Sequence, residues 1–401
     1  MIGSEILRNI SHFYHECDKP TFWFGVLMMC RISGAFSIPQ VVIYAGMVLY
    51  ALFLLFQRRQ GLYAPLVVFL IYIPLQLIVV NPNPIFKSWE RYVLFLLMII
   101  CVSSLIEGAK TAGLRKKIFQ IMLFFCIFLG VGSFFAKFLG INFMLPNERD
   151  YVFGVGTFGG LTTHSMTLGP IAGIGVIYGC YLSMRSEKPS KKRIYWMLTA
   201  LCACAMFFSA SRSALLATIG GSLVAIYRMK GAALKSFKTI VGIAFVGILS
   251  FPIWSGTLDA VIAKNNGNIA AGSMYSSRED RWVSRIDEFK SSPLFGVGFD
   301  AVDMKLSAKG GQVDVSTGTV EAGSSWLTLL SMTGVIGTLL LLPVFITSYT
   351  RVFKKKGMFG GLTCGVLTLF YIHMMAEGYI FYGGSPLAFM VWLTMAVAHD
   401  S

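Results

Sequence analysis

Several arginines stand at the borders of strongly apolar segments in this sequence. Arg212 lies in the stretch FSASRSALLA and precedes a run without charge that extends to residue 227. At the centre of a membrane helix, an arginine costs about 2.5–3.5 kcal/mol on insertion scales, so such a charge needs a partner. Arg278, Arg281 and Arg285 follow in SREDRWVSRIDEF, where their spacing would place all three on one face of a helix.

These arginines indicate an anion site. Guanidinium groups bind phosphate oxygens through paired, parallel hydrogen bonds. Two separate segments that bring guanidinium groups to one water–lipid boundary therefore predict a site made by Arg212, Arg278 and Arg281. For the second segment the alternative is a salt-bridged surface helix, because Asp280, Asp287 and Glu288 are interspersed with its arginines.

Three residues could transfer protons near that site. His164 lies in LTTHSMTLGP, Glu321 precedes AGSSWLTLLSMTGVIG, and Glu377 lies in HMMAEGYIFY. Each also has an ordinary structural explanation, as a hydrogen-bonded histidine or as a carboxylate at a membrane end. The joint placement of the acidic residues on one face, opposite the arginines, nevertheless favours acid–base chemistry. No metal site is predicted, since Cys202 and Cys204 have neither histidine nor carboxylate beside them.

The composition describes the elements that must position these residues. Hydrophobic residues make up 55% of the 401 residues and charged residues only 13%, with a mean hydropathy of +0.69. A soluble domain would carry about 25% charged residues. The chain is therefore predicted to be an all-α, polytopic membrane helix bundle.

About twelve apolar runs have the length of about 17–25 residues that a bilayer requires. They lie near 21–37, 40–57, 63–81, 91–108, 118–139, 162–184, 194–209, 212–228, 239–255, 323–350, 358–376 and 380–398. The first is weakened by Arg31. Residues 1–20 resemble a short amphipathic helix on the cytoplasmic membrane surface.

Charge sorts the connections between these runs into two classes. Basic connections alternate with connections that hold most acidic residues; the basic ones lie near 57–60, 110–117, 185–193, 228–238 and 351–356. Positive loops remain in the cytoplasm, so both termini are predicted to be cytoplasmic. The net charge of +15 is thus explained by topology, and no nucleic-acid partner is predicted.

One outer connection is far longer than the rest. The predicted organisation is transmembrane helices within 21–255, a large periplasmic loop over 256–322 that contains short helices, and further transmembrane helices within 323–401. Long loops in compact proteins are usually functional. This loop carries Arg278 and Arg281, so it is expected to contribute to the site.

Four stretches resemble a known family in order and spacing. FSASRSALLA, SREDRWVSRIDEFKSSPLFGVGFD, EAGSSWLTLLSMTGVIG and the upstream GTFGGLTTHSMTLGP are similar to motifs of the O-antigen ligase and O-antigen polymerase superfamily, over roughly residues 150 to 350. The family transfers glycans from undecaprenyl-pyrophosphate at the periplasmic face of the bacterial inner membrane, without a metal or another cofactor. The resemblance implies that Arg212 and Arg278 hold the pyrophosphate leaving group.

The resemblance also has one departure. Ligases of the family carry a histidine–asparagine pair where this sequence has Gly323 and Ser324. Glu321 is the nearest proton acceptor, with His164 and Glu377 as substitutes. This favours an inverting glycan polymerase, with a chain-length regulator protein as an expected partner besides the lipid-linked glycans. The alternatives are a ligase that acts on lipid A core or protein, and a lipid-linked glycan flippase.

Overall fold

The computed structural model describes residues 17–36, 38–57, 61–144, 158–230, 279–307, 313–314 and 318–401. Over these ranges the chain is mostly helical, with two short antiparallel ladders, and this agrees with the predicted helical class. Most of the predicted amphipathic lead-in and the whole predicted span at 239–255 lie outside the described residues. So does Arg278.

The described residues form a series of long helices joined by short connections. In chain order the elements are α2 (Lys19–Cys30), α3 (Gln40–Leu55), β1 (Gly61–Leu62), α4 (Ala64–Val80), a 3-10 turn (Pro84–Phe86), α5 (Ser88–Val102), β2 (Ile106–Glu107), α6 (Ala109–Phe138), α8 (Ser165–Arg185), α9 (Pro189–Phe208), α10 (Arg212–Lys230), α13 (Glu279–Ser291), α14 (Met304–Ser307), β3 (Val313–Asp314), β4 (Thr319–Val320), α15 (Ser325–Lys354), α16 (Met358–His373) and α17 (Pro386–His399). The short helices α13 and α14 lie within the predicted long loop.

Helices occupy the predicted spans that are described, but several bounds differ. α2 ends at Cys30 and α5 at Val102, before the predicted 37 and 108, and α6 and α17 begin elsewhere than predicted. α6 begins at Ala109, well before the apolar run, because the basic residues ahead of that run are good helix formers. Hydropathy marks the part that can enter a bilayer, whereas the backbone hydrogen bonds continue beyond it. α17 begins only at Pro386, because proline suits the first turn of a helix and Gly383 and Gly384 precede it.

Three helices of the described residues are long and apolar enough to cross a membrane, by length and composition: α6, α8 and α15. Four further helices are apolar but shorter, namely α3, α4, α16 and α17. Large apolar side chains such as Val41, Leu49 and Ile78 are exposed on α3 and α4, as expected for surfaces that face lipid. The count of twelve spans stays a prediction.

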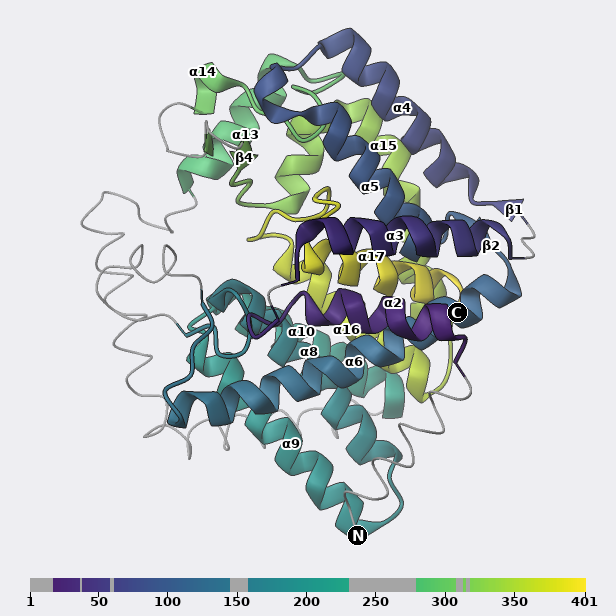
Figure 1. Cartoon of the computed structure of the whole chain (residues 1–401), viewed down its shortest axis with the longest axis vertical. Coiled ribbons are helices and arrows are strands. Elements are labelled where there is room, and N and C mark those ends of the chain that lie inside the picture. The colour runs from purple at the N-terminus through teal and green to yellow at the C-terminus, as the bar shows by residue number, and fades with distance from the viewer. Residues whose placement is uncertain are drawn as a thin grey trace.

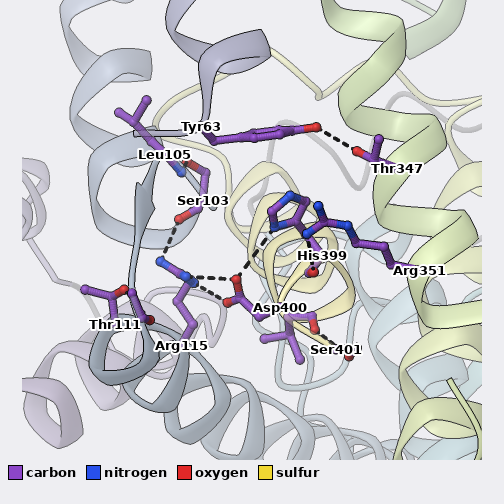
Figure 2. Close-up of polar contacts among 12 residues, drawn as sticks. Tyr63, Ser103, Leu105, Thr111, Arg115, Thr347, Arg351, His399, Asp400 and Ser401 are labelled. Atoms are coloured by element: carbon purple, nitrogen blue, oxygen red, sulfur yellow. Dashed lines mark hydrogen bonds and ion pairs between the residues drawn. The ribbon is translucent and has the colours of Figure 1, made fainter. Parts of the chain in front are cut away.

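The predicted cytoplasmic connections meet at one end of the molecule. Strand β1 pairs with β2, which joins the two connections that follow α3 and α5. Arg115 of α6 donates to both carboxylate oxygens of Asp400, at 2.7 and 3.0 Å, and also to the backbone oxygens of Ser103 and Ile106 (Figure 2). Arg351 of α15 donates to the carbonyl of His399 at 3.1 Å, so α6, α15 and α17 are tied together here.

The predicted outer connections meet at the opposite end. Ser33, after α2, forms a β-bridge with Thr162, before α8. Arg91 of α5 forms an ion pair of 3.2 Å with Asp300, so α13 and α14 lie beside the ends of α4 and α5 (Figure 1). The structure thus separates the two classes of connection that charge had separated in the sequence, and the side of the membrane stays a prediction.

A break in α15 receives the chain that follows α13. Gly334 has φ 66°, outside the helical region, and this frees backbone groups on both sides of it. The N–H groups of Val297 and Gly298 bond to the carbonyls of Ser331 and Met332, at 2.9 and 3.2 Å, and that of Val335 bonds to the carbonyl of residue 293 at 2.8 Å. The segment PLFGVGF therefore fixes the position of α13 against α15.

Candidate functional site

Arg212 follows a tight turn between α9 and α10. Ala210 has φ 53°, in the left-handed region, and Ser209 supports the turn by donating to the Met206 carbonyl at 2.7 Å. Small hydroxyl side chains favour such turns because they bond to nearby backbone groups. Arg212 is exposed at the start of α10 and makes no ion pair or side-chain hydrogen bond to another described residue. Its guanidinium is therefore available to a ligand.

His164 stands at the start of α8, close to that turn. Its Nδ1 accepts a hydrogen bond of 2.9 Å from the Met166 N–H, so His164 is the N-cap of α8. A Cβ on Gly169 would lie only 2.7 Å from the Cβ of Ala214 and 3.0 Å from that of Ser211. The beginnings of α8 and α10 are therefore in close contact, which brings His164 to the same end of the molecule as Arg212.

A second part of the site lies where α13 contacts the start of α15. Arg281 forms an ion pair with Glu321, whose side chain is 53% exposed. Trp282 donates through Nε1 to the Gly323 carbonyl at 3.3 Å. The structure therefore joins two residues that the sequence had assigned to different roles, an anion contact and a base.

Gly323 occupies a position that a larger residue would strain. Its φ is 73°, and a Cβ there would lie 2.9 Å from the Cβ of Arg281. Both observations favour glycine, since side chains are rarely accommodated at positive φ. Gly323, which replaces the histidine of ligases, is thus the residue at which the segment before α15 comes into close contact with α13.

Glu377 lies in the connection that covers the same loop. Its backbone carbonyl accepts hydrogen bonds from the N–H and the hydroxyl of Ser325, at 2.9 and 2.7 Å, and thereby holds the first turn of α15. Ser325 Oγ accepts in turn from the Tyr379 N–H at 3.0 Å. Gly378 is in contact with Ala322, so the segment that contains Glu377 lies beside the segment that contains Glu321.

Helices α10 and α16 connect the two parts. They pack antiparallel through glycines, with Gly221 against the carbonyl of Gly365 and Gly361 against Ala225. Two further turns along this register place Arg212 beside the end of α16, from which the chain continues to Glu377. The described site residues therefore lie at the same end of α8, α10, α13 and α15.

Two ion pairs at this end, one fully buried and one partly exposed, were not assigned from the sequence. Arg285 donates to Glu288 at 2.8 Å, with both side chains fully buried, and Glu288 also accepts from the Asp303 N–H at 3.0 Å. Arg91 bonds to Asp300 and, at 2.8 Å, to the Gly318 carbonyl. The available signal was the presence of basic residues such as Arg91 on the predicted outer side, where positive charge is uncommon.

Burial changes the chemistry of Asp300. Loss of solvent contact raises the pKa of Asp300 to about 7, although the attraction of Arg91 acts in the opposite direction. The same loss of solvent lowers the pKa of Arg285, which Glu288 partly offsets. Within the described residues, no three His, Cys, Asp or Glu side chains are grouped so that they could hold a metal ion.

The arrangement can therefore present guanidinium groups to an anion and a carboxylate to a hydroxyl at one surface. Comparison with known proteins gave one match, to the family model described as O-antigen ligase, over residues 197–342. No curated protein matched the chain. The matched segment contains Arg212, Arg281 and Glu321 and three of the four motifs noted in the sequence; the upstream motif with His164 lies before it. Over this part of the chain, the match supports a relation to the O-antigen ligase and O-antigen polymerase superfamily.

Proposed function

We propose that the chain is a membrane glycosyltransferase that polymerises undecaprenyl-pyrophosphate-linked repeat units at the periplasmic face of the bacterial inner membrane. The observation that carries this proposal is the O-antigen ligase match, which covers the turn at Arg212, helix α13 and the start of α15. The apolar helices support a membrane location. Lipid-linked glycans are the substrates that the family implies.

In the proposed reaction, the acceptor hydroxyl oxygen forms a bond to the anomeric carbon of the donor sugar. The bond from that carbon to the pyrophosphate oxygen breaks at the same time, and its electron pair leaves with the pyrophosphate. Arg212, Arg278 and Arg281 stabilise the departing charge, an effect that is usually the largest catalytic contribution. In-line displacement inverts the anomeric configuration, and the step uses no metal ion.

Glu321 takes the proton from the acceptor hydroxyl in this scheme. A positioned base typically contributes about 10²–10⁴-fold to such a step. Its contact with Arg281 places the proton acceptor beside one of the proposed leaving-group contacts. His164 and Glu377 lie at the same end and are the alternatives for this role, although Nδ1 of His164 is used as a helix cap.

A ligase is the second candidate, because the matching family model is described as O-antigen ligase. Such an enzyme would move the finished glycan to lipid A core or to protein. The residues at the ligase histidine–asparagine positions, Gly323 and Ser324, favour the polymerase. Ser324 also caps α15 by accepting from the Leu327 N–H, which is a structural role.

The test is to supply the purified protein with undecaprenyl-pyrophosphate oligosaccharides, with and without a lipid A core acceptor. A polymerase lengthens the lipid-linked glycan without the core. Transfer that requires the core would instead indicate a ligase. Movement of intact lipid-linked glycan across a vesicle membrane without any new glycosidic bond would indicate a flippase, and would overturn the proposal.

A further inference from the structure

Three polar side chains meet around the backbone of Gly384, and none of them has a role in the scheme above. A Cβ at position 384 would lie 3.5 Å from the Tyr44 hydroxyl and 3.6 Å from both Arg31 Nη2 and Gln40 Nε2. Arg31 is the C-cap of α2, while Gln40 and Tyr44 belong to the start of α3. The missing side chain of Gly384 therefore leaves a small space surrounded by three groups that can donate hydrogen bonds.

Arg31 has no anionic partner among the described residues. Its Nη1 is shielded from solvent and has no hydrogen-bond partner there, and its guanidinium forms no ion pair with a described carboxylate. Gln40, by contrast, donates to the Tyr44 hydroxyl. A shielded guanidinium nitrogen without an acceptor is unfavourable, so this arrangement favours the binding of an anion at the partly exposed Arg31 side chain.

The position of Arg31 links the two parts of the candidate site. Ser33, two residues after Arg31, forms a bridge with Thr162, which precedes His164. On the other side, the connection that contains Gly384 also contains Tyr382, whose hydroxyl donates to the Val320 carbonyl at 2.6 Å, next to Glu321. Arg31 is thus at the outer end, between the His164 and Glu321 segments.

We propose that Arg31, with Gln40 and Tyr44, binds a second anionic group of the substrates, separate from the leaving-group pyrophosphate assigned to Arg212 and Arg278. The inference rests on the proposed function. In a polymerase both donor and acceptor are linked to a lipid through pyrophosphate, so two such groups reach the same face. A guanidinium fork with two neutral donors suits phosphate oxygens, and a carboxylate of an acidic sugar offers the same charge.

The test compares Arg31→Gln with wild type in transfer to two acceptors with identical sugars. One is linked to lipid through a non-cleavable pyrophosphate analogue, so it cannot serve as a donor; the other is a free oligosaccharide without phosphate. We expect the KM of the lipid-linked acceptor to rise about 10- to 100-fold, the loss expected for a charge-assisted hydrogen bond. An equal rise for both acceptors identifies an acidic sugar as the anion, and an unchanged KM for both would overturn the site.

Two further variants make the result specific. Gly384→Ala retains Arg31, and its methyl group would meet its neighbours at ordinary contact distances, so the fold should tolerate it. It places an atom in the proposed anion space and should raise the same KM. Arg193→Gln is the matched control. Arg193 is exposed near the start of α9, at the end of the molecule away from the candidate site, and its substitution should leave the KM unchanged.

A binding measurement separates failure of this inference from failure of the proposed function. The thermal unfolding temperature is measured with inorganic pyrophosphate for wild type, Arg212→Ala and the double variant with Arg31→Gln. We expect the single variant to retain part of the pyrophosphate-induced increase and the double variant to retain clearly less, since only Arg278 and Arg281 then remain of the proposed anion contacts. An increase that is the same in both would exclude Arg31 as an anion site, whether or not the wild type transfers glycan.

Discussion

At the scale of single residues, the site depends on charges that the protein itself satisfies to different degrees. Arg212 is exposed and has no partner among the described residues, whereas Arg281 is paired with Glu321. An unpaired guanidinium is ready for an anion. A paired one must exchange its carboxylate for the ligand or bind both, so the two arginines are expected to respond differently to substitution.

We expect Arg212→Ala and Arg278→Ala each to reduce glycan transfer by at least about 100-fold, because each removes a donor to the charge that develops on the leaving group. Lysine at either position should not restore activity, since an ammonium lacks the planar fork. The measurement is the rate of glycan extension by purified variants. Activity close to wild type in Arg212→Ala would remove support for the pyrophosphate site and leave α13 as a salt-bridged surface helix.

Glu321→Gln preserves size but removes the proton acceptor. Transfer should fall by about 10²–10⁴-fold while binding of the carrier lipid persists. The acidic limb of the wild-type pH–rate profile should disappear in this variant. Asp287→Asn in α13 is a matched control that also removes a carboxylate. If Glu321→Gln is active and His164→Ala or Glu377→Gln is inactive, the role of the base moves to that residue.

At the scale of elements, α13 is held in place by two of its own charged side chains, which are buried in the protein. Arg285 and Glu288 form their ion pair inside the protein, and Glu288 also accepts from the backbone after α13. Arg285, which the sequence had placed on the same helix face as Arg281, therefore anchors α13 in the protein. This separates a residue that positions the helix from residues that can reach substrate.

Arg285→Ala should therefore act on stability more than on the chemical step. Removing one member of a buried pair leaves the other charge uncompensated, which typically costs about 3–5 kcal/mol. We expect earlier thermal unfolding and faster proteolysis near α13, while the variant that does fold retains measurable transfer. A double variant, Arg285→Met with Glu288→Leu, should be more stable than Arg285→Ala because it leaves no buried charge. Wild-type stability in Arg285→Ala would contradict the anchoring role.

Asp300 makes the attachment of the loop to α5 dependent on pH. Burial raises its pKa to about 7, against the attraction of Arg91, and Tyr382 is the other titratable group close to it. Because the pKa of the folded state lies above the ordinary value of 3.8, the contribution of Asp300 to stability is complete below that value and is lost as pH rises toward 7.

The corresponding measurement is thermal unfolding of wild type and Asp300→Asn between pH 4 and pH 8. The wild type should lose stability over the range from about 4 to about 7, whereas Asp300→Asn should be flatter because its amide does not titrate. Identical pH profiles in the two proteins would show that Asp300 does not control this attachment.

At the scale of the whole molecule, the connections separate into two ends. The cluster around Arg115 and Asp400 lies at one end, and Arg91, Arg212 and Glu321 lie at the other. This agrees with a membrane protein that performs its chemistry on one side. The predicted assignment is that the Arg115 end faces the cytoplasm and the Glu321 end faces the periplasm.

Cysteine substitution tests that assignment. A cysteine at Ser190, at the start of α9, and one at Ser307, at the end of α14, should react with a membrane-impermeant reagent from opposite sides in sealed vesicles. The native cysteines of the described residues are mostly buried, so their background labelling should be low. Labelling of both positions from the same side would contradict the two-ended arrangement.

Much of the molecule was determined by local sequence. Apolar runs of bilayer length predicted the helices, because each span is one continuous stretch whose hydropathy can be seen without knowledge of its neighbours. The small residues before Arg212 likewise marked the turn after which α10 begins. The basic connections predicted which loops lie at the same end of the molecule, because the charge of each loop can be counted from its own sequence. The motifs that resemble the superfamily could be recognised for the same reason, each being a short continuous stretch.

Tertiary structure alone decided which side chains face one another. Glu321 and Arg281 are forty residues apart in the sequence, and their pairing depends on α13 docking at the break of α15 near Gly334. The sequence shows that Arg285 and Arg91 are present but not which carboxylates they meet, because the partner of a charged residue depends on how the helices pack. The donors around Gly384 come from the end of α2 and the start of α3, and only long-range packing brings Gly384 beside them.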